Sequence, residues 1–232
     1  MRILSRGLVL SVALMLQPVI SDARHQKPVS VVLDKPQAEI RIFDAQHPLD
    51  PSVHIPPGLR AATPYRFECQ PESWLDDTSQ YTDAGGSLHL VEKPRRFLIH
   101  LSESSVTWLP GDASDKLKEH EAGHAQIYQT IFKTQADKAA EEAAEPLIDQ
   151  DFEGSGPDLD AARAEINHKV TEALSSQYQR AIKDMAIKAD EKYDALTDHG
   201  RNSVVTEQAV KQVLNEILPS NEHNRGPRFV GD

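Results

Sequence analysis

The 232-residue chain has few of the features that would assign it to several common classes of protein. It has one cysteine, Cys69, which excludes an intramolecular disulfide framework and a zinc site built from several cysteine thiolates. Basic residues are scarce, since 25 Lys and Arg face 36 Asp and Glu, and the formal net charge of −11 argues against nucleic-acid binding. Hydrophobic residues make up only 39% of the chain, which argues against a polytopic membrane protein.

The first 23 residues have the order of regions that is typical of a secretory signal peptide. Arg2 and Arg6 give a basic start, residues 7–16 are apolar or small, and small residues precede a cleavage site near Ala23. The apolar run is well short of the ~20 residues that span a bilayer, so we expect no stable membrane anchor after cleavage. The mature protein is therefore expected to be acidic, and secreted or periplasmic.

Apolar residues recur mostly with period two between residues 29 and 109, which is typical of strands in a half-buried sheet. The alternation is clearest at residues 39–43, 88–91, 96–101 and 106–109. Six prolines interrupt the stretch 44–87, so we expect mostly loop there, with a short strand near 65–69.

Beyond Gly111 the chain becomes rich in Ala, Glu, Lys and Gln, and its apolar spacing changes to that of helices. The expected helices run from Asp112 or Ser114 to about 144, from Asp158 or Asp160 to Gly200, and over about 204–218. Strands first and helices afterwards predict an α+β fold with an antiparallel or mixed sheet. We expect one domain, 24–218, with a β-rich half (24–110), a helical half (111–218) and a flexible tail (219–232).

The segment with the clearest chemical signature is an H-E-x-x-H motif, formed by His120, Glu121 and His124 within the first predicted helix. Two histidines four residues apart lie on one helical face, so both imidazoles can bind one zinc ion. Zinc lowers the pKa of a coordinated water molecule towards ~7, where Glu121 can take its proton as a general base. The motif therefore predicts a Zn²⁺ site on a zincin-like active-site helix.

A catalytic zinc usually has three protein ligands, and the spacing leaves two candidates for the third. Glu145 lies at the distance of a thermolysin-like glutamate, but Pro146 ends the helix at that point. His199 stands at the end of the long second helix, just before a glycine that can turn the chain. We favour His199, since histidine is a standard ligand of catalytic zinc.

Tyr193 and its neighbour are further candidates near the end of the long helix. The Tyr193 phenol could donate a hydrogen bond to an oxyanion, although its place on the apolar stripe also suits a core residue. Asp194 or Asp198 could orient a ligand imidazole from behind, and either also suits a solvated helix end.

The order of the motifs resembles a bacterial family of predicted secreted zinc-dependent proteases, classed as a domain of unknown function. The resemblance rests on VTWLP at 106–110, HEAGHAQI at 120–127, and a Y-D-x-x-T-x-H-G pattern at 193–200. It implies zinc ligands at His120, His124 and His199, with Glu121 as the general base.

These observations predict a secreted zinc metalloendopeptidase that acts on a peptide or protein substrate. We expect the substrate backbone to bind by strand addition beside the metal helix, along residues 95–101 or 104–109. The alternative is an exported zinc-binding or protein-interaction module without turnover, in which the site leaves no open position for water.

Overall fold

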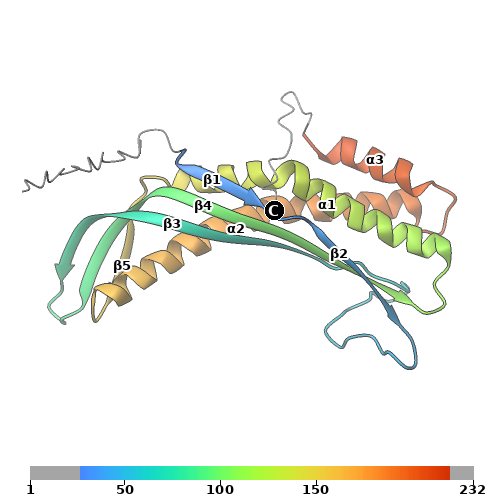
Figure 1. The fold of residues 1–232 in the computed structure, drawn as a ribbon, viewed down its shortest axis with the longest axis horizontal. Helices are drawn as coiled ribbons and strands as arrows, with labels where there is room; N and C mark the ends of the chain where they lie inside the picture. Colours follow the sequence, from blue (N-terminus) through green and yellow to red (C-terminus); the bar gives the residue numbers. More distant parts are fainter. Residues whose placement is uncertain (1–26, 220–232) are drawn as a thin grey trace, which may run out of the picture.

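The computed structural model describes residues 27–219, which form a sheet with helices on one of its faces (Figure 1). The strands are β1 (Val29–Leu33), β2 (Gln37–Phe43), β3 (Tyr65–Thr82), β4 (Leu88–Pro110) and β5 (Phe152–Gly156). The helices are α1 (Asp115–Ala144), a short 3-10 turn η2 (Glu145–Leu147), α2 (Leu159–Thr197) and α3 (Thr206–Ile217). The order of strands and helices confirms the α+β class, although β5 comes between the two long helices.

The sheet is organised around β4, which pairs with all four other strands. Along one edge β5 pairs antiparallel with residues 88–92, then β1 and β2 pair parallel with residues 97–101 and 104–110. Along the other edge β3 pairs antiparallel over almost its full length. The sheet is thus mixed, and strand addition along 95–101 or 104–109 is wrong, because both edges of β4 are already occupied there.

The strands predicted at 88–91, 96–101 and 106–109 are parts of one long strand, β4, and the predicted loop ends at Tyr65, because β3 and β4 form one long hairpin (Figure 1). Pro71 lies within β3, which pairs on one side only among the described residues, and such an edge strand tolerates proline. Pro94 lies beside a register shift at Trp74/Leu75, where the ladder is already interrupted. The distal part of β3 is exposed on both faces, so its sequence shows no alternation.

Residues 152–156 form a strand, although glycines such as Gly154 and Gly156 are typical of a loop between two helices. A Cβ on Gly154 would lie 2.1 Å from the Ala162 carbonyl oxygen of α2, so glycine here permits close packing of helix against strand. This contact holds the first turn of α2 against the sheet.

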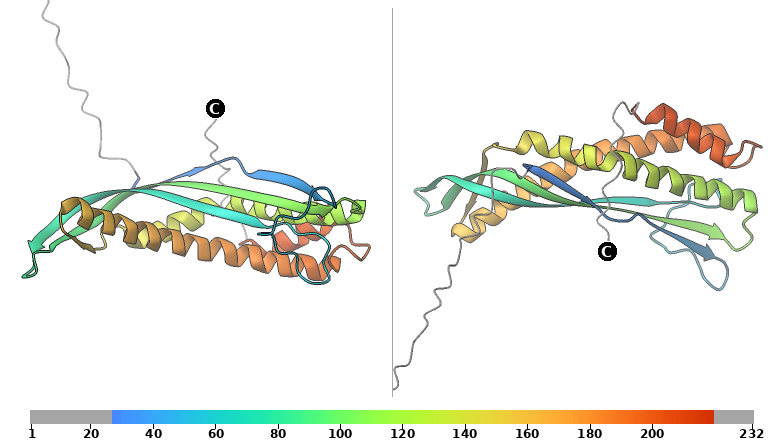
Figure 2. Two further views of the ribbon diagram at one scale, coloured as in Figure 1. Left: turned by 90° about the horizontal axis from the view of Figure 1, so that it is seen from below. Right: turned by 45° about the horizontal axis from the view of Figure 1, so that its top comes forward.

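The three helices cover one face of the sheet, and the core lies between the two layers (Figure 2). The inward face of β4 buries Phe97, Ile99 and Leu101 completely. α2 packs against it with a stripe of buried residues at mostly four-residue intervals: Ile166, Val170, Leu174, Tyr178, Ile182, Ala186, Ala189 and Tyr193. At ~1.5 Å per residue this helix is nearly 60 Å long, so it links the hairpin end of the molecule to the end that holds the H-E-x-x-H motif.

The helix boundaries agree closely with those expected from the sequence. Ser114 caps α1 by accepting a hydrogen bond from the Leu117 amide, and Asp158 caps α2 in the same way through the Ala161 amide. The helix α3 buries Val210 and Val213 against the rest of the core.

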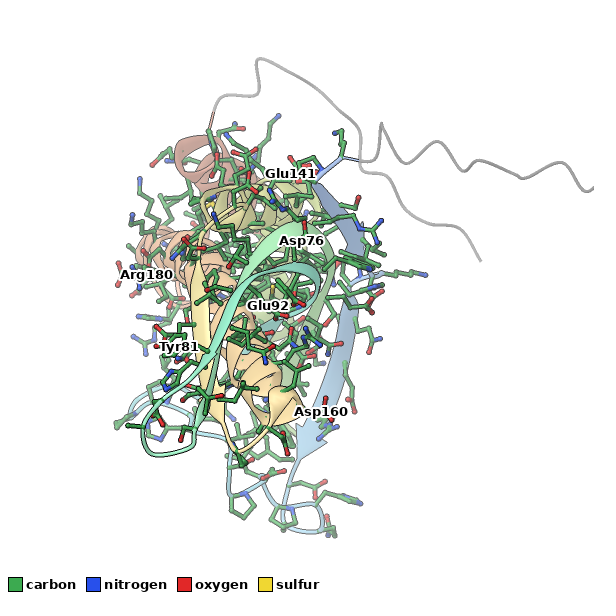
Figure 3. All side chains as sticks on the ribbon, turned by 90° about the vertical axis from the view of Figure 1, so that its left-hand side faces the viewer. Asp76, Tyr81, Glu92, Glu141, Asp160 and Arg180 are labelled. Carbon is green, nitrogen blue, oxygen red and sulfur yellow. The ribbon has the colours of Figure 1, made fainter. Side chains whose placement is uncertain are left out.

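The hairpin end of the molecule is fixed to α2 by an ion pair between Arg163 and the buried carboxylate of Glu92. Arg163 Nε donates to Glu92 Oε1 at 2.7 Å, and its Nη2 donates to Asp77 Oδ1 at the same distance. Figure 3 looks onto this end, where Glu92, Tyr81 and Asp160 are labelled. This pair joins β3, β4 and α2 far from the H-E-x-x-H motif.

The buried carboxyl group of Glu103 on β4 should make the stability of the fold depend on pH. Both carboxylate oxygens of Glu103 are buried, and burial raises the pKa of Glu103 to about 7, although the nearby Ser105 and Lys133 lower it. Since the folded-state pKa exceeds the unfolded one, stability falls as pH rises from about 4.5 to about 7. We expect Glu103→Gln to stabilise the fold at pH 8 by about 2–3 kcal/mol relative to its effect at pH 4.5.

Urea unfolding at the two pH values measures this difference, with Glu68→Gln on the neighbouring strand as the control. A Glu103→Gln effect that is the same at pH 4.5 and pH 8 would contradict the prediction.

The expected signal peptide (1–23) lies outside the described residues, as does all but the first residue of the expected tail (219–232). None of the helices within 27–219 combines the length and the apolar composition that a bilayer-spanning helix needs.

Candidate metal centre

The H-E-x-x-H motif spans the second and third turns of α1, and the side chains of His120, Glu121 and His124 are buried. His120, Glu121 and His124 expose only 4%, 5% and 8% of their surface, respectively. A solvated helix face would leave these polar residues exposed, so their burial requires specific partners.

His124 is oriented by an acid from the neighbouring helix. Its Nδ1 lies 2.9 Å from Asp190 Oδ1, and the Tyr128 hydroxyl donates to Asp190 Oδ2 at 2.7 Å. A carboxylate accepts hydrogen bonds, so Nδ1 carries the proton in this contact. The other nitrogen, Nε2, is then the one available to bind a metal ion.

His120 is oriented in the same sense by a hydroxyl. Its Nδ1 lies 3.2 Å from Thr197 Oγ1, and that hydroxyl donates its proton to the Tyr193 carbonyl at 2.7 Å. Because the hydroxyl proton is used there, Thr197 accepts from His120 Nδ1. The lone pair of His120 is therefore also on Nε2.

The two Nε2 atoms and one carboxylate oxygen converge on a single point. His120 Nε2 lies 3.2 Å from His124 Nε2, and Asp194 Oδ1 lies 3.3 Å and 3.2 Å from these two nitrogens. Tetrahedral zinc with bonds of ~2.0–2.1 Å requires ligand atoms about 3.3 Å apart. Asp194 Oδ1 is buried and lacks a hydrogen-bond partner among the described residues. His120, His124 and Asp194 thus form a group that could hold a metal ion.

The electrostatics of this group favour a positive charge at the point of convergence. Burial alone lowers the pKa of a histidine, but contacts with Asp190 and Asp194 raise the pKa of His124 to about 10. Burial alone raises the pKa of Asp194. Its contacts with the surrounding histidines outweigh burial and hold that pKa well below its usual range. A proton on His124 can supply this positive charge when no metal ion is bound, and a divalent cation would replace that proton.

The two candidates for the third ligand differ sharply in position. Glu145 is exposed beyond the far end of α1, roughly 30 Å along the helix from His124, and cannot reach the same ion. His199 lies in the left-handed region (φ 51°) just after α2, with its Nδ1 3.3 Å from Asp194 Oδ1. The structure brings Asp194 into the group with His120 and His124, whereas His199 lies beside Asp194.

Tyr193 lies beneath the two histidines. Its ring stacks on His120 at a centroid distance of 5.0 Å and packs edge-on against His124 at 4.8 Å. Its hydroxyl is fully buried and donates to the His120 carbonyl at 3.1 Å. This arrangement suits the core role rather than an oxyanion donor, because the phenolic proton is used within the protein.

Two glycines allow this close packing. A Cβ on Gly123 would lie 2.1 Å from the Tyr193 hydroxyl, so only glycine lets α1 approach α2 here. Gly200 has a positive φ of 75°, and a Cβ there would lie 2.9 Å from His120 Cβ. Gly123 and Gly200 are therefore both needed for the close packing of side chains around the candidate metal site.

Glu121 lines a cavity next to the group of residues that could hold a metal ion. Its Oε2 accepts a hydrogen bond from Thr63 Oγ1 at 2.7 Å, which fixes the carboxylate between α1 and the chain entering β3. The cavity has a volume of about 210 Å³, and its lining includes Glu121, His120, Asp194 and His199. A carboxylate beside the candidate metal site and open to a cavity is placed to act on a water molecule there.

The sequence reasoning missed Asp190 altogether and gave Asp194 only a supporting place. The available signal was the spacing, because Asp190 and Asp194 are four residues apart on α2 as the histidines are on α1. Two packed helices with the same spacing can bring their side chains together in pairs.

No family model, curated protein or solved structure that was compared with this chain matches it.

Proposed function

We propose that this protein is an exported, zincin-like zinc metallopeptidase. The observation that carries the proposal is the convergence of His120 Nε2, His124 Nε2 and Asp194 Oδ1 at the spacing of a tetrahedral zinc site. We assign these three residues as the ligands. Zn²⁺ would activate a water molecule and polarise the peptide carbonyl.

Each neighbouring residue has a role that follows from its contacts. Asp190 and Thr197 hold the two imidazoles with Nε2 directed at the ion. Glu121 takes a proton from the attacking water and later gives it to the leaving amine. Thr63 keeps that carboxylate in place through its hydrogen bond to Oε2.

The cavity favours an enzyme over the alternative of a zinc-binding module without turnover. A purely structural zinc site is closed by four protein ligands. Here the group has three residues, and two of them line a cavity together with Glu121. A peptide carbonyl can therefore approach the side of the site that carries the proposed general base.

Metal analysis and a cleavage assay test this proposal together. We expect about one zinc per chain after purification, and cleavage of a denatured generic protein that a chelator abolishes and added zinc restores. A chain that binds no zinc with all its histidines intact would overturn the proposal. Zinc bound tightly without cleavage of any substrate would instead support the non-catalytic alternative.

A further inference from the structure

Two arginines lie at the cavity that Glu121 lines, although the protein as a whole is acidic. Arg60 comes from the loop before β3 and Arg201 from the turn after α2, and both line this cavity. The formal net charge of the chain is −11, so two guanidinium groups at this one site run against the overall charge. Such local reversals of charge attract ligands of the opposite sign.

Both arginines are held by contacts that leave donors for a ligand. Arg60 Nη2 donates to Asp112 Oδ1 at 2.5 Å, and Arg201 Nη2 donates to the Gly58 carbonyl at 3.2 Å. Lys116 Nζ donates to the Arg201 carbonyl at 2.9 Å and fixes its backbone. A guanidinium has five N–H donors, and each of these side chains uses only one nitrogen in the contacts above.

The cavity lining has two acids beside its two arginines, and Asp112, outside the lining, pairs with Arg60. The acids of the lining are Glu121, which accepts from Thr63, and Asp194, which faces the histidines. With a divalent cation in place, the positive charges at this cavity outweigh these two carboxylates. A second cavity, whose lining includes His124, Tyr128 and Asp190, differs from this one in charge. Among the described residues its lining contains no Lys or Arg.

The size of the cavity limits what can bind there. Sites for drug-sized ligands occupy ~300–1,000 Å³, whereas this cavity measures about 210 Å³. It therefore has room for about one residue of a substrate, next to the bond being cleaved. Leu59 and Leu117 give it an apolar wall that suits the methylene groups of such a residue.

We propose that Arg60 and Arg201 bind a carboxylate of the substrate, so that the enzyme prefers peptides with a carboxylate beside the scissile bond. This inference rests on the proposed peptidase function. The carboxylate could belong to an internal Asp or Glu side chain or to the C-terminus of the peptide, and the same guanidinium chemistry recognises both.

The test uses the zinc-loaded full chain and matched peptides that differ only in Glu, Gln or Lys beside the cleaved bond, each with a free or an amidated C-terminus. We expect kcat/KM for the preferred carboxylate to exceed that for its neutral counterpart by roughly 10- to 100-fold. A preference that follows Glu identifies the side chain, and one that follows the free C-terminus identifies the terminal carboxylate. Equal rates for Glu, Gln and Lys peptides with either terminus would overturn the inference.

The variants Arg60→Gln and Arg201→Gln should each bring this ratio towards one. Arg66→Gln, an exposed arginine on β3 that pairs with Glu68, is the control and should keep the ratio. If both cavity variants keep the full preference for carboxylates, the assignment of these arginines is wrong.

A binding measurement separates this inference from the proposed function. Zinc-loaded Glu121→Gln should bind a labelled carboxylate peptide roughly 10- to 100-fold more tightly than its neutral counterpart, as measured by fluorescence anisotropy. That preference without hydrolysis by the wild-type chain would keep Arg60 and Arg201 as a carboxylate-binding site and overturn the peptidase proposal. Hydrolysis by the wild type without any preference in either assay would overturn only the inference.

Discussion

Glu121→Gln is expected to lower kcat by roughly 10²- to 10⁴-fold while the protein keeps its zinc. The amide cannot accept a proton from the attacking water, but it has almost the same shape as the carboxylate. Its oxygen can still accept the hydrogen bond from Thr63, so the fold around the site should be preserved. The measurement combines the cleavage rate of a fluorogenic peptide with the zinc content of the same sample.

Glu119→Gln is the matched control, because Glu119 is an exposed glutamate on the same helix. It should leave both the cleavage rate and the zinc content close to those of the wild type. Cleavage by Glu121→Gln within a few-fold of the wild-type rate would remove Glu121 from the mechanism and leave the metal site without its general base.

The helical half could be predicted well from the sequence, whereas the sheet could be predicted only in part. Ser114 and Asp158 are strong capping residues, and the apolar stripe of α2 repeats over many turns, so both long helices are marked at their ends and along their length. The distal part of β3 carries no such mark. The hairpin strands extend beyond the helices, and exposure of both faces of β3 removes the alternation that would reveal a strand.

Long-range pairing explains the rest of the difference between sequence and structure in the sheet. Pro71 argues against a central strand, but β3 pairs with β4 on one side only among residues 27–219. Gly154 argues for a turn, but it serves the close approach of α2. Which strand lies at an edge, and which helix crosses a strand, are properties of the assembled fold that a local pattern does not contain.

In the candidate site, too, some residues follow from a local sequence pattern and others are brought together only by the fold. His120, Glu121 and His124 form a local motif on one helix, and their mutual placement follows from helical geometry alone. Asp190 and Asp194 join them only because α1 and α2 pack side by side, with Gly123 against Tyr193. The sequence predicted a third ligand, His199, at the end of α2, but it could not show that the Asp194 side chain is the one that lies beside the two histidines.

The choice between Asp194 and His199 as third ligand leads to the second large expected effect. Asp194→Asn should weaken zinc binding by much more than the 10- to 100-fold that is typical for loss of a residue behind the ligands. An amide oxygen is neutral, so the two histidines would lose the negative charge that favours a cation between them. His199→Ala should retain zinc, because its Nδ1 lies beside Asp194 rather than in the group of converging atoms.

Competition with a chelator of known affinity measures these zinc constants, and circular dichroism shows that each variant is folded. Asp198→Asn is the matched control, since Asp198 is exposed, lies four residues after Asp194 and has a backbone conformation that asparagine readily adopts. Asp190→Asn should fall between the two, with a loss of roughly 10- to 100-fold, because it orients His124 without touching the ion. If His199→Ala loses the metal while Asp194→Asn holds it at wild-type affinity, His199 is the third ligand, and it must turn towards the histidines when zinc binds.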